Sequence, residues 1–301
     1  MHRNLVLIAG YPKSGSTWLR VVFEVLLDSG RAGLSINELP GGYYGAWRRV
    51  LFDAFAPGNS ADMPNGDVDD DLPHVFAALS ATTPQPVLIK AHDVALRTRS
   101  GDWLFPPQCI RAVLYLVRHP FDVAVSYAHH LDVPVEEAVS MMGRDLVIGE
   151  TFGKARLPHH ERIGSWSGNI ESWLHADPYE VTIARYEDIH ADPVSAFARL
   201  AQAAGLPAGW QEITYAVETG SFERLRRQEA EQGFFERPRT SRGFFRSGRP
   251  GAWRDSLSDD MQVKLVSEHG AVMSRLGYTD DGRAIAVSRL GGQGRNGSLA
   301  G

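Results

Sequence analysis

The sequence predicts a three-layer α/β/α fold, in which helices cover both faces of a mainly parallel central sheet. Apolar runs that suit buried strands lie at residues 5–9, 86–90, 111–117 and 180–185. Stretches with apolar residues at helical spacing alternate with these runs, which is typical of parallel strands joined by helices. A glycine-containing loop follows the first run and leads directly into a helical pattern, as in folds that bind phosphate groups.

The expected helices follow from the spacing of apolar residues. The first is expected over residues 17–27, directly after the loop. The clearest amphipathic pattern predicts a helix over 162–175, where apolar residues recur at spacings of three, four, three and one: Ile163, Trp166, Ile170, Trp173 and Leu174. Further helices are expected over 192–204, ended by the Gly-Leu-Pro run at 205–207, and over 258–276.

Three segments lack such a pattern. Residues 57–72 contain the acidic group Asp67, Asp69, Asp70 and Asp71 and are expected to be a solvated loop, with a metal site as the alternative. Residues 143–161, which end in two histidines, are expected to be a mobile surface or lid segment over the acceptor. The glycine-rich residues 291–301 are expected to be a disordered tail.

Composition limits the partners and the location. The 301 residues are enough for one large domain or two small ones, and we expect a single domain over residues 1–290. The net charge of −5 disfavours a nucleic-acid partner, because such binding needs a basic excess. There is no apolar stretch long enough to span a membrane and no signal-peptide pattern at the start, so a cytoplasmic location is expected.

The loop at residues 10–17 reads Gly-Tyr-Pro-Lys-Ser-Gly-Ser-Thr. Between a strand and a helix, it directs backbone N–H groups and the positive end of the helix toward an anion, which indicates a P-loop type of nucleotide-binding fold. In nucleoside triphosphatases the lysine follows the second glycine of the loop. Here Ser16 fills that position and Lys13 lies three residues earlier.

This loop resembles the 5′-phosphosulfate loop of sulfotransferases that use 3′-phosphoadenosine 5′-phosphosulfate (PAPS). Three further segments resemble that family in the same order: Val-Leu-Ile-Lys-Ala-His at 87–92, Arg-His-Pro-Phe-Asp-Val-Ala-Val-Ser at 118–126 and Phe-Arg-Ser-Gly-Arg-Pro-Gly-Ala-Trp at 245–253. In finer detail the sequence is most similar to bacterial sulfotransferases that modify natural products. The resemblance implies PAPS as cosubstrate, 3′-phosphoadenosine 5′-phosphate (PAP) as product, and no metal.

The resemblance also implies the catalytic residues. His92 follows a predicted buried strand at its carboxyl end and would be the base, since a histidine can accept a proton near neutral pH. Lys13 would stabilise the negative charge on the leaving group, with Lys90 as a second cation near the transferring group. The alternatives to these catalytic roles are that Lys13 only neutralises the bound anion and that Lys90 is a surface lysine at the end of a strand.

The nucleotide would be held by residues from three of these segments, together with Trp18, Tyr186 and Phe222. The family resemblance assigns the loop residues Ser14, Gly15, Ser16 and Thr17 to the 5′-phosphate, and Arg118 and Ser126 to the 3′-phosphate. It assigns Trp18 and Phe222 to the adenine, Tyr186 to the nucleotide, and the late loop Arg246, Ser247 and Gly248 to the phosphate. Ser247 stands where the family usually has lysine, so binding of the 3′-phosphate would be weaker, or Arg249 or Arg242 would replace the missing cation. His129 and His130 are expected as exposed positions, with a place beside the acceptor as the alternative.

A small-molecule hydroxyl, phenolic or from a sugar, is the expected acceptor. The residues Tyr43, Tyr44, Trp47, Phe52 and Phe55 would line an apolar acceptor pocket or simply pack in the core. The alternatives to a sulfotransferase are a P-loop nucleotide kinase or triphosphatase, and a regulatory module that binds PAP without catalysis. The sequence leaves open whether the protein is a monomer or a homodimer.

Overall fold

The computed structural model describes residues 3–28, 35–38, 49–56, 58, 63, 65–148, 161–206, 208–237, 241 and 243–279. Four parallel strands form the central sheet in the order β2 (Val87–Ala91), β1 (Leu5–Ala9), β3 (Ile110–Val117) and β6 (Val181–Arg185). Each strand lies within one residue of a predicted apolar run. The prediction of a parallel α/β sheet is therefore confirmed.

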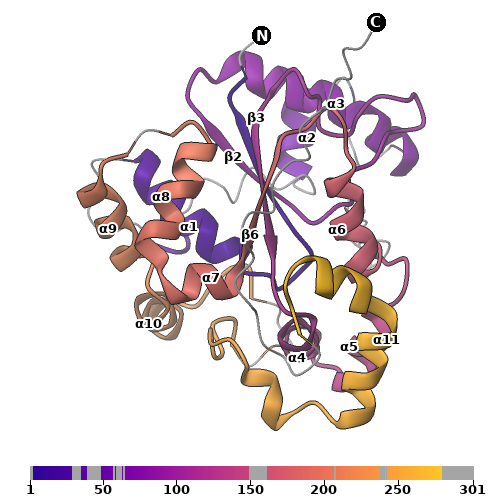
Figure 1. Cartoon of the computed structure of the whole chain (residues 1–301). Coiled ribbons are helices and arrows are strands. Elements are labelled where there is room, and N and C mark those ends of the chain that lie inside the picture. The colour runs from indigo at the N-terminus through magenta and orange to yellow at the C-terminus, as the bar shows by residue number, and fades with distance from the viewer. Residues whose placement is uncertain are drawn as a thin grey trace, which may run out of the picture.

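Helices cover both faces of this sheet (Figure 1). Side chains alternate along a strand, so Val6 and Ile8 of β1 pack into one core and Leu5 and Leu7 into the other. The first core is covered by α1 (Ser16–Leu27), α7 (Tyr186–Ala191), α8 (Pro193–Ala203), α9 (Trp210–Thr219) and α10 (Phe222–Gln232). The second is covered by α2 (Arg49–Phe55), α3 (Asn65–Thr82), α4 (Pro120–Leu131), α5 (Val135–Met142), α6 (Trp166–Leu174) and α11 (Asp259–Arg275).

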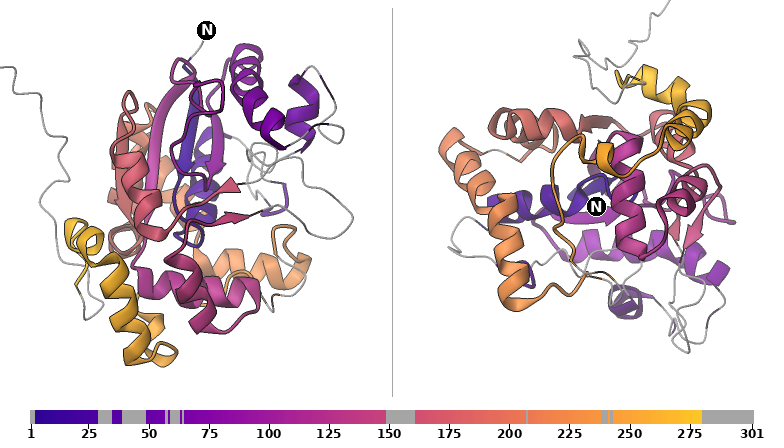
Figure 2. Two further views of the ribbon diagram at one scale, coloured as in Figure 1. Left: turned by 90° about the vertical axis from the view of Figure 1, so that its right-hand side faces the viewer. Right: turned by 90° about the horizontal axis from the view of Figure 1, so that it is seen from below.

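The carboxyl ends of the four strands meet at one end of the molecule, because all four run in the same direction. Both α1 and α4 begin at this end. Figure 2, right, shows it from below, with the segment that follows α10 crossing it before the short 3-10 helix η3 (Ala252–Asp255). In open α/β sheets, ligands bind at the carboxyl ends of the strands.

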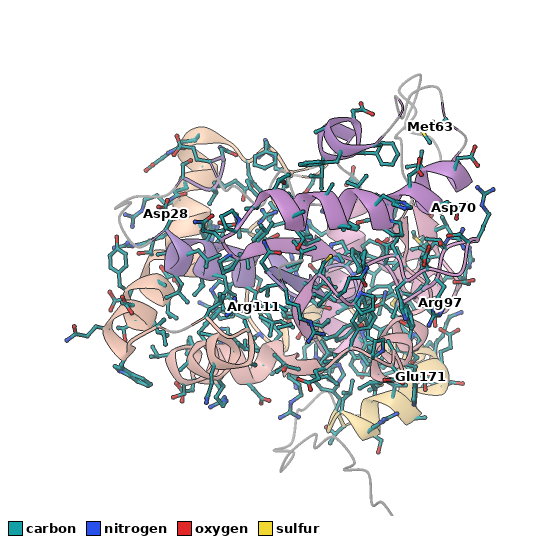
Figure 3. The ribbon with its side chains drawn as sticks, turned by 90° about the horizontal axis from the view of Figure 1, so that it is seen from above. Asp28, Met63, Asp70, Arg97, Arg111 and Glu171 are labelled. Carbon is teal, nitrogen blue, oxygen red and sulfur yellow. The ribbon has the colours of Figure 1, made fainter. Side chains whose placement is uncertain are left out.

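Three predicted helices agree with the structure to within one residue. Residues 17–27, 192–204 and 258–276 were expected, and α1, α8 and α11 are found there. The last turn of α8 is fixed by Arg111, whose guanidinium donates to the carbonyls of Ala204 (3.0 Å) and Gly205 (2.6 Å) (Figure 3). These bonds satisfy carbonyls that the helix leaves without an internal partner.

The predicted helix at 162–175 starts too early. Residues Glu161–Arg162 form β5, which pairs antiparallel with β4 (Val147–Ile148), and α6 begins only at Trp166. Gly164 has a φ of 68°, which interrupts a right-handed helix, and the Ser165 hydroxyl caps α6 by accepting from the Gly168 N–H. Ile163, which fitted the helical pattern, is buried outside the helix.

The prediction of a solvated loop at 57–72 is wrong for residues 65–72, which form the first turns of α3. Acidic side chains suit this position, because the first turn of a helix carries partial positive charge. Asp70 pairs with Arg99 at the periphery of the molecule (Figure 3), whereas Asp69 is buried and lies 3.5 Å from Arg162. Within the described ranges, no three His, Cys, Asp or Glu side chains are placed to hold a metal ion.

Other expectations lie partly or wholly outside the described residues. These are the lid at 143–161 apart from its two ends, the tail at 291–301, and Tyr43, Tyr44, Trp47, His159, His160 and Arg242. Phe52 is buried in the core beside the sheet. No helix in the part of the chain that is described has the length and apolar character needed to cross a membrane. The single domain over 1–290 stays a prediction.

Candidate active site

The loop between β1 and α1 packs tightly against the rest of the molecule. Gly15 has a φ of 108°, and a Cβ atom there would lie 2.7 Å from the Tyr186 ring. A side chain would therefore force the loop away from α7, which begins with that tyrosine. Lys13 has a φ of 70°, an uncommon conformation for a residue other than glycine, and it lies within the turn of the loop.

The start of α1 offers unpaired donors to an anion. Gly15 supplies no side-chain cap, and the first turn contains no acidic residue. Ser16 and Thr17, which open the helix, are both buried. Ser14 is 1% exposed, and its hydroxyl has no hydrogen-bond partner among the described residues. A buried hydroxyl without a partner is costly, so the loop fits a ligand such as phosphate that accepts hydrogen bonds.

Lys13 extends toward α4. Its Nζ atom lies 3.3 Å from Nδ1 of His130 and 4.3 Å from the centre of the Phe244 ring. Burial, followed by the nearby charges of Lys90 and Arg118, lowers the pKa of Lys13 to about 7. The free site thus holds more positive charge than it can stabilise alone, and an anion would relieve the repulsion.

His92 directly follows β2 and has a defined tautomer. Its Nδ1 atom lies 2.7 Å from the carbonyl oxygen of Gly10. A carbonyl only accepts hydrogen bonds, so Nδ1 carries the proton and Nε2 keeps a free lone pair. Burial, and then the charges of Lys90 and Lys13, lower the pKa of His92 to about 3. The imidazole is therefore neutral at physiological pH and able to accept a proton at Nε2.

Lys90 lies beside a buried carboxylate. Its Nζ atom is 3.4 Å from Oε2 of Glu236, on the segment after α10, and the other oxygen of that carboxylate accepts from Arg20 of α1. The three segments that meet here lie far apart in the sequence. Lys90 is thus half-buried and ion-paired, which disfavours the interpretation of a solvent-exposed lysine at the end of a strand.

Arg118 connects the strand end to the late loop. Its guanidinium stacks 4.4 Å from the centre of the Tyr186 ring and donates to the Arg249 carbonyl at 3.3 Å. The Tyr186 hydroxyl donates to the carbonyl of Gly248. The Nε atom of Arg118 is buried and finds no hydrogen-bond partner in the part of the chain that the structure describes. An arginine held in this way has a donor left for an anionic ligand.

The predicted aromatic residues lie around Tyr186. Trp18 meets the Tyr186 ring edge-on at 5.7 Å, and its own Nε1 is buried with no hydrogen-bond partner within the described ranges. Gly248 has a φ of 65°, and a Cβ atom there would lie 2.4 Å from the Phe222 ring. Glycine is therefore required where the late loop crosses Phe222. Trp18, Tyr186 and Phe222 together line one region of the site.

The remaining predicted residues are less closely connected. Ser126 is half-buried on α4 and Arg246 is exposed on the late loop; within the described ranges neither side chain makes a hydrogen bond or ion pair. The Ser247 hydroxyl accepts from the Arg249 N–H at 3.4 Å. The interactions among the described residues thus connect Lys13, Lys90, His92, Arg118, Tyr186 and Gly248, and no hydrogen bond or ion pair found there ties Ser126 or Arg246 to them.

Buried carboxylates hold the late loop in place. Asp122, in the first turn of α4, accepts from the N–H groups of Gly251 (2.7 Å) and Trp253 (3.2 Å). Glu229 of α10 accepts from those of Phe244 (2.7 Å) and Phe245 (2.9 Å). The loop is therefore fixed at both ends, and its backbone does not need further residues to define its path over the strand ends.

The expectation that His129 and His130 are exposed is wrong, since both are half-buried. His129 Nε2 lies 3.0 Å from the Gly243 carbonyl, and His130 contacts Lys13. Sequence reasoning also missed Glu236 and Phe244. The sequence did contain a signal for His130. It follows Ser126 by four residues in a predicted helix, so the two lie on one face of that helix, and Ser126 was already a candidate for the site.

A parallel sheet that brings a glycine-containing loop, a neutral histidine and half-buried cations together at its strand ends is typical of α/β enzymes that act on anionic groups. The sulfotransferase domain family matches residues 3–277, and the chain belongs to this family. The protein is therefore a sulfotransferase.

Similar proteins carry the same domain. The chain is 25% identical over 291 residues to flavonol 3-sulfotransferase of Flaveria bidentis, covering 88% of this chain and 80% of that one. It is 24% identical over 279 residues to cytosolic sulfotransferase 12 of Arabidopsis thaliana, covering 86% and 74%. A structure of retinol dehydratase with androsterone and the inactive cofactor PAP shares the fold, with 19% identity, a TM-score of 0.61 and coverage of 91% and 81%.

Proposed function

We propose that the protein transfers the sulfuryl group of PAPS to a hydroxyl of a small-molecule acceptor, with His92 as the base. The observation that carries this proposal is the tautomer of His92, which leaves the Nε2 lone pair available near the half-buried cations Lys13 and Lys90. PAPS supplies a sulfuryl group already activated by its bond to a phosphate oxygen. The residues of the chain must then bind the anion, accept the acceptor's proton and stabilise the leaving phosphate.

The proposed binding residues fit the two phosphates. The Ser14 hydroxyl, the backbone around Gly15 and the start of α1 with Ser16 and Thr17 would hold the 5′ end. Arg118 would hold the 3′-phosphate through its free donor, with Ser126 and the late-loop residues Arg246, Ser247 and Gly248 assisting. Trp18 and Phe222 would contact the adenine, and Tyr186 would support both regions.

His92 and the two lysines would divide the chemistry between them. Nε2 of His92 would take the proton from the acceptor hydroxyl, while Lys13 and Lys90 would stabilise negative charge on the leaving phosphate oxygen. Anionic ligand near these lysines would offset the charges that lower the pKa of His92, so its basicity would rise when the nucleotide binds.

The acceptor is proposed to be a phenol, a sugar hydroxyl or another natural-product alcohol. One relative is named for sulfation of a flavonol, which is a phenolic small molecule, and another is named cytosolic, in keeping with a cytoplasmic location. A triphosphatase is disfavoured by Ser16 at the position of the loop lysine. A regulatory module without catalysis is disfavoured because both Lys13 and His92 are present, half-buried and close enough for the charge of Lys13 to act on His92.

The nucleotide proposal predicts that Arg118→Ala weakens PAP binding by a factor of about ten to over a hundred, because hydrogen bonds to charged groups contribute roughly 1.5–3 kcal/mol. AMP lacks the 3′-phosphate, so its affinity should hardly change. Calorimetric titration of both ligands into wild type and variant is the measurement. Equal losses for PAP and AMP, or no loss for PAP, would contradict a 3′-phosphate site at Arg118.

Sulfuryl transfer is expected to continue in excess EDTA, because Lys13, Lys90 and the start of α1 supply the positive charge that Mg²⁺ supplies in kinases. The measurement is the turnover of PAPS with a hydroxyl acceptor, with and without the chelator. Activity that disappears with EDTA and returns with Mg²⁺ would support the kinase alternative instead.

A further inference from the structure

A carboxylate lies buried among the cations of the proposed transfer site. The Glu236 side chain is only 6% exposed, and its partners Arg20 and Lys90 are 2% and 13% exposed. One carboxylate oxygen accepts from Arg20, and the other lies 3.4 Å from Nζ of Lys90. Arg20 and Lys90 therefore share a single counter-charge, supplied by a segment distant in sequence from both.

The negative charge of Glu236 also acts on the residues assigned to catalysis. Although burial favours the neutral acid, Lys90 and Arg20 lower the pKa of Glu236 to about 2, so it is ionised at neutral pH. Its charge affects both Lys13 and His92 and opposes the effect of Lys90 on each. A buried carboxylate repels anions, so its presence in an anion-binding site calls for a specific role.

We propose that Glu236 is a positioning residue of the transfer site, which balances Lys90 and Arg20 in the free protein and yields Lys90 to the incoming anionic end of the nucleotide. This inference rests on the proposed function, since it places Lys90 beside the transferring group. In the bound state the carboxylate would stay on Arg20.

The two partners of Glu236 suit these different roles. Arg20 lies within α1 and is almost fully buried, so its position is fixed by packing around the helix. Lys90 is the last residue but one of β2 and carries its charge on a flexible chain, and its Nζ atom lies 3.4 Å from Glu236. Lys90 is therefore the partner that can exchange the carboxylate for a ligand.

This role predicts that loss of the Glu236 charge strengthens anion binding, which loss of a purely structural ion pair would not do. Without the negative charge, Lys90 lacks a competing partner and the site is more positive, so anions should bind more tightly. At the same time Lys90 loses its fixed orientation and the product leaves more slowly, so kcat should fall. A role in folding alone would give unchanged or weaker anion binding.

The test is calorimetric titration of PAP and of inorganic pyrophosphate into wild type, Glu236→Gln and Glu236→Asp. Glu236→Gln should bind both ligands about tenfold more tightly, as expected for loss of one nearby negative charge. Glu236→Asp keeps the charge and should stay near wild type. As a matched control, Asp69→Asn removes another buried, arginine-paired carboxylate on α3 and should not tighten either ligand.

Loss of Glu236 leaves Arg20 without its partner, so the single variant could fail to fold. In that case Arg20→Met and the double variant Arg20→Met with Glu236→Gln provide the comparison, and the double variant should bind pyrophosphate more tightly. Equal or weaker pyrophosphate binding on loss of Glu236, or equal tightening by Asp69→Asn, would overturn the inference. Wild type that binds pyrophosphate but not PAP would instead overturn the proposed nucleotide and leave the Glu236 comparison valid.

Discussion

Replacing His92 by alanine is expected to reduce turnover by about 10²–10⁴-fold while PAP affinity stays nearly unchanged. The imidazole is held by the Gly10 carbonyl with Nε2 free, which is the arrangement needed to accept a proton from a hydroxyl. Its removal would take away the base without removing any group proposed to hold the phosphates. Steady-state turnover of PAPS with an acceptor, together with calorimetry of PAP, measures both parts.

A second histidine provides the control for this experiment. His175, at the end of α6, is exposed, and its imidazole bonds to the carbonyl of Glu171 in its own helix. His175→Ala should therefore retain wild-type turnover. If His92→Ala also kept turnover near that of wild type, the assignment of His92 as the base would be wrong.

Replacing Lys13 by methionine is expected to lower kcat by about 10²–10³-fold, because the ammonium would act on charge that develops in the transition state. Methionine has a similar length and can still pack against Phe244, so the loss should come from the charge. Lys13→Arg restores a positive charge and should recover part of the activity. A methionine variant as active as the arginine variant would contradict an electrostatic role.

The lowered pKa of Lys13 predicts a specific pH dependence. Burial, with Lys90 and Arg118, lowers this pKa to about 7, and catalysis needs the charged form. The value of kcat/KM, which reports the free enzyme, should therefore be full below pH 7 and fall as the pH rises through about 7. His92 is already neutral throughout this range. The alkaline decline should vanish in Lys13→Arg, since a guanidinium stays charged; its persistence there would assign it to another group.

The sequence was most informative where chemistry and local structure lie in one short segment. The strand at Leu5–Ala9, the loop after it and α1 are consecutive, so their apolar runs and glycines predicted both the fold and the position of Lys13. The start of α6 was predicted too early because Ile163 fits the helical spacing of apolar residues. It is buried in the core, but it precedes the helix, which begins at Trp166. The start of α3 was missed because its acidic residues look like a loop when the helix N-terminus is not known.

Contacts between distant segments were not predictable from a single sequence. Glu236 pairs with Lys90 across 146 residues, and Lys13 meets His130 across 117. Neither pairing leaves a local pattern, because each depends on how the late segment and α4 cross the strand ends. For this reason the sequence predicted the cations of the site but not the carboxylate that balances them.

The most direct test of sulfuryl transfer at this site uses PAPS with labelled sulfur, mixed with an extract of small molecules from the organism that makes the protein. Mass spectrometry should detect a labelled sulfate ester, formed in equal amount to PAP, with the wild-type enzyme. Neither should accumulate with His92→Ala or Lys13→Met. If both variants formed the sulfated product as well as the wild-type enzyme does, the account would be contradicted. Transfer of phosphate from ATP in place of sulfuryl transfer would contradict it as well.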